Sequence, residues 1–143
     1  MDGLTYETKN GWTDDRLNNQ AEIFSFCEDY KKYLDAAKTE RLACDEAVRM
    51  ARENGFCDIS EKQALKAGDR VYFVNRAKSV YLAVIGEEDI QNGINFVIAH
   101  IDSPRLDLKQ NPLYEDSDLS LFKTHYYGGI KKYQWTTIPL SLI

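Results

Sequence analysis

One apolar segment limits the folds open to this chain more than any other feature of the sequence. The run INFVIA, residues 94–99, has the continuous apolar character of a strand buried on both faces. It ends abruptly at His100; Asp102 follows two residues later, and Ser103-Pro104 then favours a turn. Because such a strand must be covered on both faces, the segment predicts a layered domain with a mostly buried sheet.

Two amphipathic helices are predicted ahead of this strand. The first runs from about Asn19 to Lys38, and the second from Thr39, a suitable N-cap, to Asn54, with Gly55 placed to end it. In both, apolar residues recur at three- and four-residue spacing, so we interpret the two stripes as core. The first stripe contains Ile23, Phe26, Cys27, Tyr30, Tyr33, Leu34 and Ala37, and the second contains Ala43, Cys44, Ala47, Val48, Met50 and Ala51.

Further strands are predicted after the helices. The string VYFV from Val71, the polar turn NRAK and the string SVYLAVIG up to Gly86 together indicate a hairpin. Helices followed by strands favour the α/β class, with helices flanking a mostly buried mixed sheet. The first residues, 1–18, are polar and contain two glycines, so we expect an arm there rather than a packed element.

Length and charge exclude several classes of protein. The chain has 143 residues, which is enough for one domain with a real core. Its formal charge is -5 with scattered Lys and Arg, so it lacks the basic stripe of a nucleic-acid binder. It has neither an apolar run of roughly 20 residues nor the order of a signal peptide. We therefore expect a cytoplasmic protein without nucleic-acid or membrane partners.

The three cysteines, Cys27, Cys44 and Cys57, are widely spaced and form no CxxC pair. This pattern favours buried free thiols, with zinc binding by cysteine as a weaker alternative.

His100 is the first candidate for a functional residue. It follows the carboxyl end of the predicted strand, where ligands gather in open α/β sheets. A neutral imidazole is a good zinc ligand, and a ligating histidine usually has a carboxylate on its other ring nitrogen. Asp102 can take that role if the chain turns sharply. However, H-x-D alone is a weak motif, because most histidines at strand ends simply form a hydrogen bond to a neighbour.

The longer string AHIDSPRLDLK, with YYGGIKKYQW downstream, resembles the aspartyl aminopeptidase family of zinc exopeptidases over nearly the whole chain. The resemblance implies that His100 binds zinc as a metal ligand and that Asp102 stands behind it as its orienting catalytic partner. It also implies two zinc ions in each complete active site, with other divalent metals as alternatives. The activity it implies is removal of N-terminal amino acids from peptide substrates.

The same resemblance implies a longer enzyme. Members of that family have several hundred residues, with a peptidase domain interrupted by a mostly β domain that mediates assembly into homo-oligomers. Residues 19–109 would then be the N-terminal part of the peptidase domain, and residues 110–143 the truncated start of the inserted domain. The apolar end, WTTIPLSLI, is expected to be a strand. Because the other ligands and the general base would lie further on, we expect this chain alone to be inactive.

Two other functions compete with this interpretation. The chain could be a non-catalytic assembly or binding module, which the apolar tail of residues 119–143 would favour. It could also be another two-zinc exopeptidase, although the residues Ser103-Pro104-Arg105-Leu106 match the aspartyl aminopeptidases better.

A few remaining residues have a structural and a functional interpretation. His125 is either a ligand or substrate contact, or a structural hydrogen-bonding residue. Asp116 and Asp118 form either a carboxylate cluster or a solvated loop. Gly128-Gly129 is either a phosphate-binding loop or a conformational element at a domain junction, and because the rest of the phosphate-loop pattern is missing we predict the conformational role.

Overall fold

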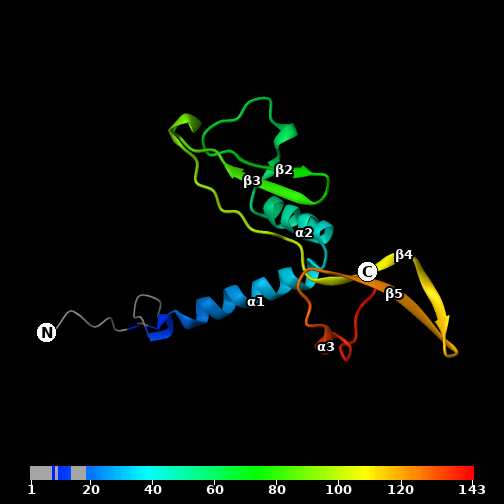
Figure 1. Ribbon diagram of the computed structural model, residues 1–143. Helices are drawn as coiled ribbons and strands as arrows, with labels where there is room; N and C mark the ends of the chain where they lie inside the picture. Colours follow the sequence, from blue (N-terminus) through cyan, green and yellow to red (C-terminus); the bar gives the residue numbers. More distant parts are fainter. Residues whose placement is uncertain (1–7, 9, 14–18) are drawn as a thin grey trace. The chain divides into compact units, whose positions relative to one another are not determined.

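The computed structural model describes residue 8, residues 10–13 and residues 19–143, so most of the predicted N-terminal arm lies outside the described residues. The chain divides into two compact units, Met1–Ile85 and Gly86–Ile143. The first contains α1 (Gln20–Ala36), α2 (Glu40–Glu53), β1 (Cys57–Asp58), β2 (Arg70–Asn75) and β3 (Ser79–Val84) (Figure 1). The second contains β4 (Arg105–Asp116), β5 (Leu119–Tyr127) and α3 (Lys132–Trp135). Single 3-10 turns lie at Gly11–Thr13, Ile59–Glu61 and Ile90–Asn92.

Both predicted helices are confirmed. Their first turns are capped by side chains close in the sequence, which is why their ends could be predicted. The side-chain oxygen of Asn19 accepts a hydrogen bond from the backbone N–H of Glu22 at 3.3 Å. At the start of α2, Thr39 Oγ1 accepts one from the backbone N–H of Leu42 at 3.3 Å. Each cap satisfies one of the donors that a helix leaves open at its first turn. Gly55, with φ of +79°, ends α2 in the left-handed conformation that favours glycine.

The predicted hairpin is also confirmed. β2 and β3 pair antiparallel from Arg70 opposite Val84 to Asn75 opposite Ser79. The residues at the turn, Arg76 and Ala77, both have positive φ, which matches the twist of a type I′ turn. β1 pairs parallel with β2 and gives the order β1-β2-β3, so this small sheet is mixed, as predicted.

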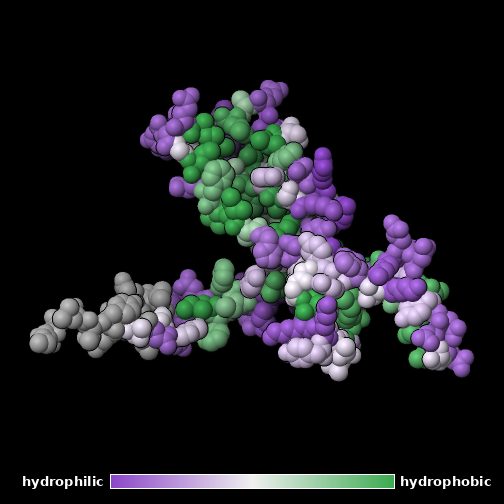
Figure 2. Space-filling view, in the orientation of Figure 1, coloured by the Kyte–Doolittle hydropathy of each residue, from purple (hydrophilic) through white to green (hydrophobic). Residues whose placement is uncertain are grey.

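The core of the first unit is small and lies between α2 and β2. Ala43, Cys44 and Ala51 are buried on α2, and Val71 and Tyr72 on β2. Tyr72 is only 3% exposed, and its hydroxyl oxygen accepts hydrogen bonds from Nε and Nη2 of Arg52 at 2.8 and 2.6 Å. The one polar atom of this buried ring is therefore satisfied. Figure 2 shows hydrophobic side chains on the surface around β2 and β3, where Phe73, Tyr81 and Leu82 are exposed.

The prediction that the stripe of α1 belongs to the core is wrong except at Ala37, which directly follows the helix and is only 6% exposed. No described residue of α1 is buried, and Phe26 is 73% exposed. Within the described residues, α2 is the main element that packs against α1, so the stripe has no second surface to cover it. The prediction of a buried thiol is wrong at Cys27 for the same reason, whereas Cys44 is buried and Cys57 is half-buried. Met50, predicted to face inward, is also exposed.

Residues 94–99 do not form the predicted strand. Residues 93–104 have no regular secondary structure, and Val97 is 100% exposed. A strand depends on hydrogen bonds to a neighbouring strand. Among the described strands, β3 pairs with β2 and β4 pairs with β5, and none of them pairs with this segment. Its apolar residues therefore remain exposed, and the predicted burial on both faces is wrong.

The second unit is built on one antiparallel hairpin. At its turn, Ser117 and Asp118 both have positive φ, again as in a type I′ turn. The pairing of β4 with β5 shifts register between Leu108 and Leu113, which marks a bulge on β4. The strand expected at the C-terminal run is wrong, because α3 is followed by residues 136–143 without a strand, and Leu142 is 78% exposed.

No described helix combines the length and the apolar character that crossing a lipid bilayer requires.

Candidate functional site

His100 and Asp102 lie together in the irregular segment that leads into β4. Nδ1 of His100 is 3.2 Å from Oδ1 of Asp102 and 3.1 Å from the backbone carbonyl oxygen of the same residue. Two acceptors at Nδ1 favour the tautomer with its proton there, which leaves the lone pair on Nε2. The His100 side chain is 84% exposed, and Nε2 has no hydrogen-bond partner among the described residues. The ring can therefore offer Nε2 to a metal ion.

The carboxylate of Asp102 has a second partner. The hydroxyl of Tyr127 donates a hydrogen bond to Oδ2 of Asp102 at 2.9 Å, while Oδ1 faces His100. The Tyr127 hydrogen bond is the main cause that lowers the pKa of Asp102, and the aspartate's own backbone and His100 act in the same direction. Asp102 is therefore a carboxylate at neutral pH, the form that best supports a ligating imidazole.

Tyr127 is itself held by β4. It is the last residue of β5 and pairs with Arg105, the first residue of β4. The guanidinium carbon of Arg105 lies 4.1 Å from the centroid of the Tyr127 ring, within the range of a cation-π contact. Nε of Arg105 also donates to Oδ1 of Asp107 at 2.8 Å. The sequence gives no sign of this role of Tyr127, because a contact across 25 positions cannot be inferred from either motif alone.

The glycine after Tyr127 brings the two sequence motifs into contact. Gly128 has φ of +74°, and a Cβ placed on it would lie 3.3 Å from Cα of Pro104. A side chain would therefore be strained by the backbone and crowded by the proline. This conformation agrees with the conformational role predicted for the glycine pair, although at Gly129 a Cβ would meet nothing within 4 Å.

The other candidate residues are placed elsewhere in the hairpin. His125 pairs with Asp107 across the strands and stacks on Tyr126 with ring centroids 5.5 Å apart. It borders a shallow open hollow formed with residues 107–111. Among the described residues, no hydrogen bond, ion pair or ring contact joins it to His100 or Asp102. The functional interpretation of His125 therefore gains no support from its surroundings.

Asp116 and Asp118 lie at the exposed turn of the hairpin. Asp116 Oδ1 accepts a hydrogen bond from Ser117 Oγ at 3.1 Å, and the backbone N–H of Asp118 donates to Glu115 at 3.0 Å. These contacts shape the turn, in agreement with the solvated-loop interpretation.

The described residues do not form a complete zinc site. Within them, no group of three or more His, Cys, Asp or Glu side chains is placed to hold a metal ion. Zinc in proteins takes at least three protein ligands, of which imidazole nitrogen is among the commonest. His100, with its outer nitrogen accessible and its inner nitrogen supported by Asp102, fits one position of such a set.

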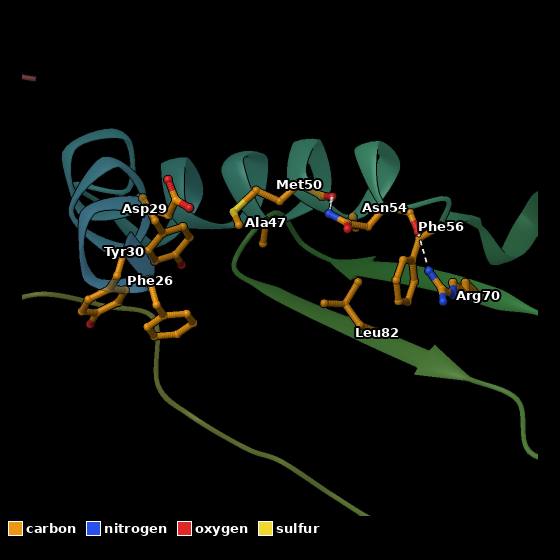
Figure 3. A pocket seen from close by; sticks show the side chains of 11 residues that line it. Phe26, Asp29, Tyr30, Ala47, Met50, Asn54, Phe56, Arg70 and Leu82 are labelled. Carbon is orange, nitrogen blue, oxygen red and sulfur yellow. Dashed lines mark hydrogen bonds between the residues drawn. The ribbon is translucent and has the colours of Figure 1, made fainter. Parts of the chain in front are cut away.

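The first unit contains an apolar cleft of about 550 Å³ that has different chemistry (Figure 3). Phe26 and Tyr30 from α1, Met50 from α2 and Leu82 from β3 line it. Phe26, Tyr30 and Met50 were predicted as core. They line this cleft instead, because the face of α1 is only partly covered by other elements. Its lining contains neither histidine nor cysteine, so it is no candidate for the metal site.

Comparison with known proteins gives one consistent result. A family model described as "Aminopeptidase I zinc metalloprotease (M18)" matches residues 33–143. A "Probable M18 family aminopeptidase 1" of Clostridium acetobutylicum is 45% identical over 143 residues, which cover 97% of this chain and 31% of that protein. The protein of the same description from Thermotoga neapolitana is 47% identical over 139 residues, which cover 97% of this chain and 30% of that protein.

Solved structures agree with these relatives. An M18 family aminopeptidase from Thermotoga maritima matches with a TM-score of 0.82 at 44% identity, covering 94% of this chain and 29% of the other. Aminopeptidase I from Borrelia burgdorferi B31 matches with a TM-score of 0.77 at 44% identity, covering 87% of this chain and 30% of the other. The chain thus spans about 31% of the length of a full relative such as the Clostridium protein.

Proposed function

Because this chain belongs to the peptidase M18 family, the aminopeptidase I zinc metalloproteases, we propose that its protein is a zinc-dependent aminopeptidase that removes N-terminal amino acids from peptides. The observation that carries the proposal is the pairing of His100 Nδ1 with the carboxylate of Asp102. This pairing leaves the outer ring nitrogen of an exposed imidazole available, as a zinc ligand requires.

In this proposal His100 supplies one ligand through Nε2, and Asp102 acts through it. The aspartate fixes the tautomer and the orientation of the ring, and its negative charge strengthens the imidazole as a ligand. Asp102 therefore contributes to catalysis by positioning rather than by contact with substrate. The hydrogen bond from Tyr127 supports this role, because it holds Asp102 in the charged form.

The family cofactor is zinc. We propose two zinc ions in each complete active site, with other divalent metals as alternatives. When bound, zinc supplies Lewis-acid activation of water and of the scissile carbonyl. Because the described residues bring no cluster of three ligands together and the chain covers only 31% of its Clostridium relative, we propose that the other ligands and the general base lie in the part of the enzyme that these 143 residues do not cover. The 143 residues alone should then be inactive. The small part of a relative that they cover, 31% of the Clostridium protein, also supports this expectation.

The domain limits and partners are proposed on the same basis. Residues 19–109 would belong to the peptidase domain, and residues 110–143 would begin an inserted domain through which copies associate. Exposed apolar side chains in this region, such as Leu113, Phe122 and Leu142, support association, and equally the competing view of a non-catalytic assembly module. We propose peptide substrates, a cytoplasmic location and no nucleic-acid or membrane partner, supported by the net charge of -5.

The chain has two histidines, which provide a matched test of the proposed function. His100→Ala and His125→Ala each remove one imidazole, and zinc content and hydrolysis of aminoacyl anilides are measured in the complete enzyme. We expect His100→Ala to lose zinc and turnover, because it removes a ligand, and His125→Ala to keep both. Full zinc content and activity in His100→Ala would contradict the assignment of the ligand. Turnover by the 143-residue chain alone, abolished by His100→Ala, would contradict the proposal that it is incomplete.

A further inference from the structure

The Asp102 carboxylate is used at both of its oxygens. Oδ1 lies 3.2 Å from Nδ1 of His100, and Oδ2 accepts the Tyr127 hydroxyl at 2.9 Å. Two contacts on opposite oxygens fix the rotation of a carboxylate about its last bond, which one contact alone leaves loose. The hydroxyl of Tyr127 therefore decides how Asp102 faces the imidazole.

Asp102 gains from such a support because its backbone belongs to no helix or strand. It lies within residues 93–104, which have no regular secondary structure. The pair it forms with His100 is well exposed, with side chains 38% and 84% accessible, and exposed pairs of this length are weak and easily rearranged. Without the Tyr127 contact the carboxylate would sample more orientations, and the backbone carbonyl oxygen of Asp102, 3.1 Å from Nδ1 of His100, would be the steadier of the two contacts to the ring.

Tyr127 is anchored well enough to supply that contact. It ends β5 in register with Arg105 of β4, whose guanidinium carbon lies 4.1 Å from the ring centroid. The next residue, Gly128, packs so closely on Pro104 that a Cβ there would be 3.3 Å from the proline Cα. The hairpin thus presents the hydroxyl from a paired strand, and the glycine contact ties that strand end to the H-x-D-S-P segment.

We propose that Tyr127 is a positioning residue for zinc: its hydroxyl fixes Asp102, and Asp102 in turn fixes the ring of His100. This inference rests on the proposed function, since it requires His100 to be a zinc ligand. Tyr127 touches neither metal nor substrate in this role, and its effect passes entirely through Asp102.

The test compares two neighbouring tyrosines in the complete enzyme. Tyr127→Phe removes the hydroxyl but keeps the ring under Arg105. Tyr126→Phe is the matched control, because its ring lies under Lys132 at 4.3 Å and its hydroxyl has no hydrogen bond among the described residues. Zinc affinity is measured by competition with a chelator. The absorption spectrum of the cobalt-substituted protein reports the ligand geometry, and thermal unfolding reports the fold.

We expect Tyr127→Phe to weaken zinc binding by about 10-fold, the lower end of the range of roughly 10–100-fold for changes in groups that support a metal ligand. The cobalt spectrum should change and kcat should fall with KM unchanged, while Tyr126→Phe behaves like the unsubstituted protein. Because Tyr127 acts through Asp102, adding Tyr127→Phe to Asp102→Asn should cause little further loss.

The outcomes separate this inference from the proposed function. Zinc binding unchanged in Tyr127→Phe but lost in His100→Ala would overturn the role of Tyr127 alone. The role of Tyr127 would also be overturned if the losses of zinc affinity in Tyr127→Phe and Asp102→Asn multiplied in the double variant. An equal loss of zinc affinity in Tyr126→Phe would overturn it too. Full zinc binding in His100→Ala would instead refute the proposed function, and this inference with it.

Discussion

The hydroxyl of Tyr127 and the carboxylate of Asp102 meet at 2.9 Å although 25 positions separate them in the sequence. This contact joins the two strings, AHIDSPRLDLK and YYGGIKKYQW, on which the resemblance to zinc exopeptidases depends. The contact of Gly128 with Pro104 joins them a second time. The two motifs therefore form one local structure, and a substitution in either one should alter the orientation of His100.

Asp102→Asn should separate the orienting role of this residue from the ligand role of His100. The amide keeps the size of the side chain and still offers an oxygen to the imidazole, but it loses the negative charge. We expect zinc to be retained at high zinc concentration while kcat falls by roughly 10–100-fold. Elemental analysis and steady-state kinetics measure the two effects. Asp118→Asn at the hairpin turn is the control, and wild-type kinetics in Asp102→Asn would make Asp102 a turn residue only.

Gly128→Ala should destabilise the protein, whereas Gly129→Ala should not. The backbone of Gly128 has φ of +74°, and the new methyl group would lie 3.3 Å from Cα of Pro104. A left-handed alanine costs about 1–2 kcal/mol in unfolding free energy, and the crowding adds to this cost. At Gly129 a Cβ would meet nothing within 4 Å. Urea unfolding of both variants tests the contrast, and equal stability of the two would show that the contact with Pro104 is absent in solution.

The thiols of the 143-residue chain should react with iodoacetamide at very different rates. Cys27 is exposed on α1, whereas Cys44 is buried and its burial raises the pKa of the thiol, so less of the reactive thiolate forms. Because the buried Cys44 reacts only when the structure around it opens locally, we expect its alkylation to be slower by more than about 10-fold. Mass spectrometry of peptides from a labelling time course distinguishes the two. Slow labelling of Cys27 would mean that its helix face is covered in solution.

The stability of the first unit should depend on Asp69 at acid pH. The Lys62 side chain, together with the backbone N–H of Lys66, lowers the pKa of this carboxyl below its ordinary value of 3.8. A lowered pKa in the folded state means that the stabilisation is complete above that ordinary value and disappears as the pH falls through the folded pKa. Asp69→Asn should therefore be less stable than the unsubstituted chain at neutral pH. The two should converge at low pH in urea unfolding, and a difference that does not change with pH would argue against this pair.

The 143-residue chain should self-associate through its exposed C-terminal residues. Leu140 and Leu142 are exposed after α3, and exposed apolar groups of this kind favour association. Light scattering should show a smaller mass after residues 135–143 are removed or after a double substitution, Leu140→Ser with Leu142→Ser. Ser141→Ala is the control between them. A monomer in every case would leave the tail without a role in assembly.

Local features of the fold could be predicted from the sequence, and features that depend on a distant partner could not. Asn19, Thr39 and Gly55 mark the helix ends because each acts on backbone groups within a few residues. The strand predicted at residues 94–99 fails because its existence depends on neighbouring strands, and none of the described strands pairs with it. Likewise, His100 and Asp102 could be selected as a pair two residues apart, whereas Tyr127 could not, since its contact depends on the register of β4 and β5.

The register shift on β4 determines which changes of length the hairpin can tolerate. Before the shift Leu106 lies opposite Tyr126 of β5, and after it Leu113 lies opposite Phe122. Both β5 residues are even-numbered and share a face, whereas one leucine is even-numbered and the other odd-numbered. The shift therefore keeps the two leucines on one face of the hairpin although their numbers differ in parity. Because side chains alternate along a strand, a single residue inserted or deleted in residues 109–112 would turn the distal half of β4 over. Leu113 and Glu115 would then exchange faces with Tyr114 and Asp116. An insertion or deletion of two residues would preserve the faces. We therefore expect related proteins to differ in the length of this segment by even numbers of residues.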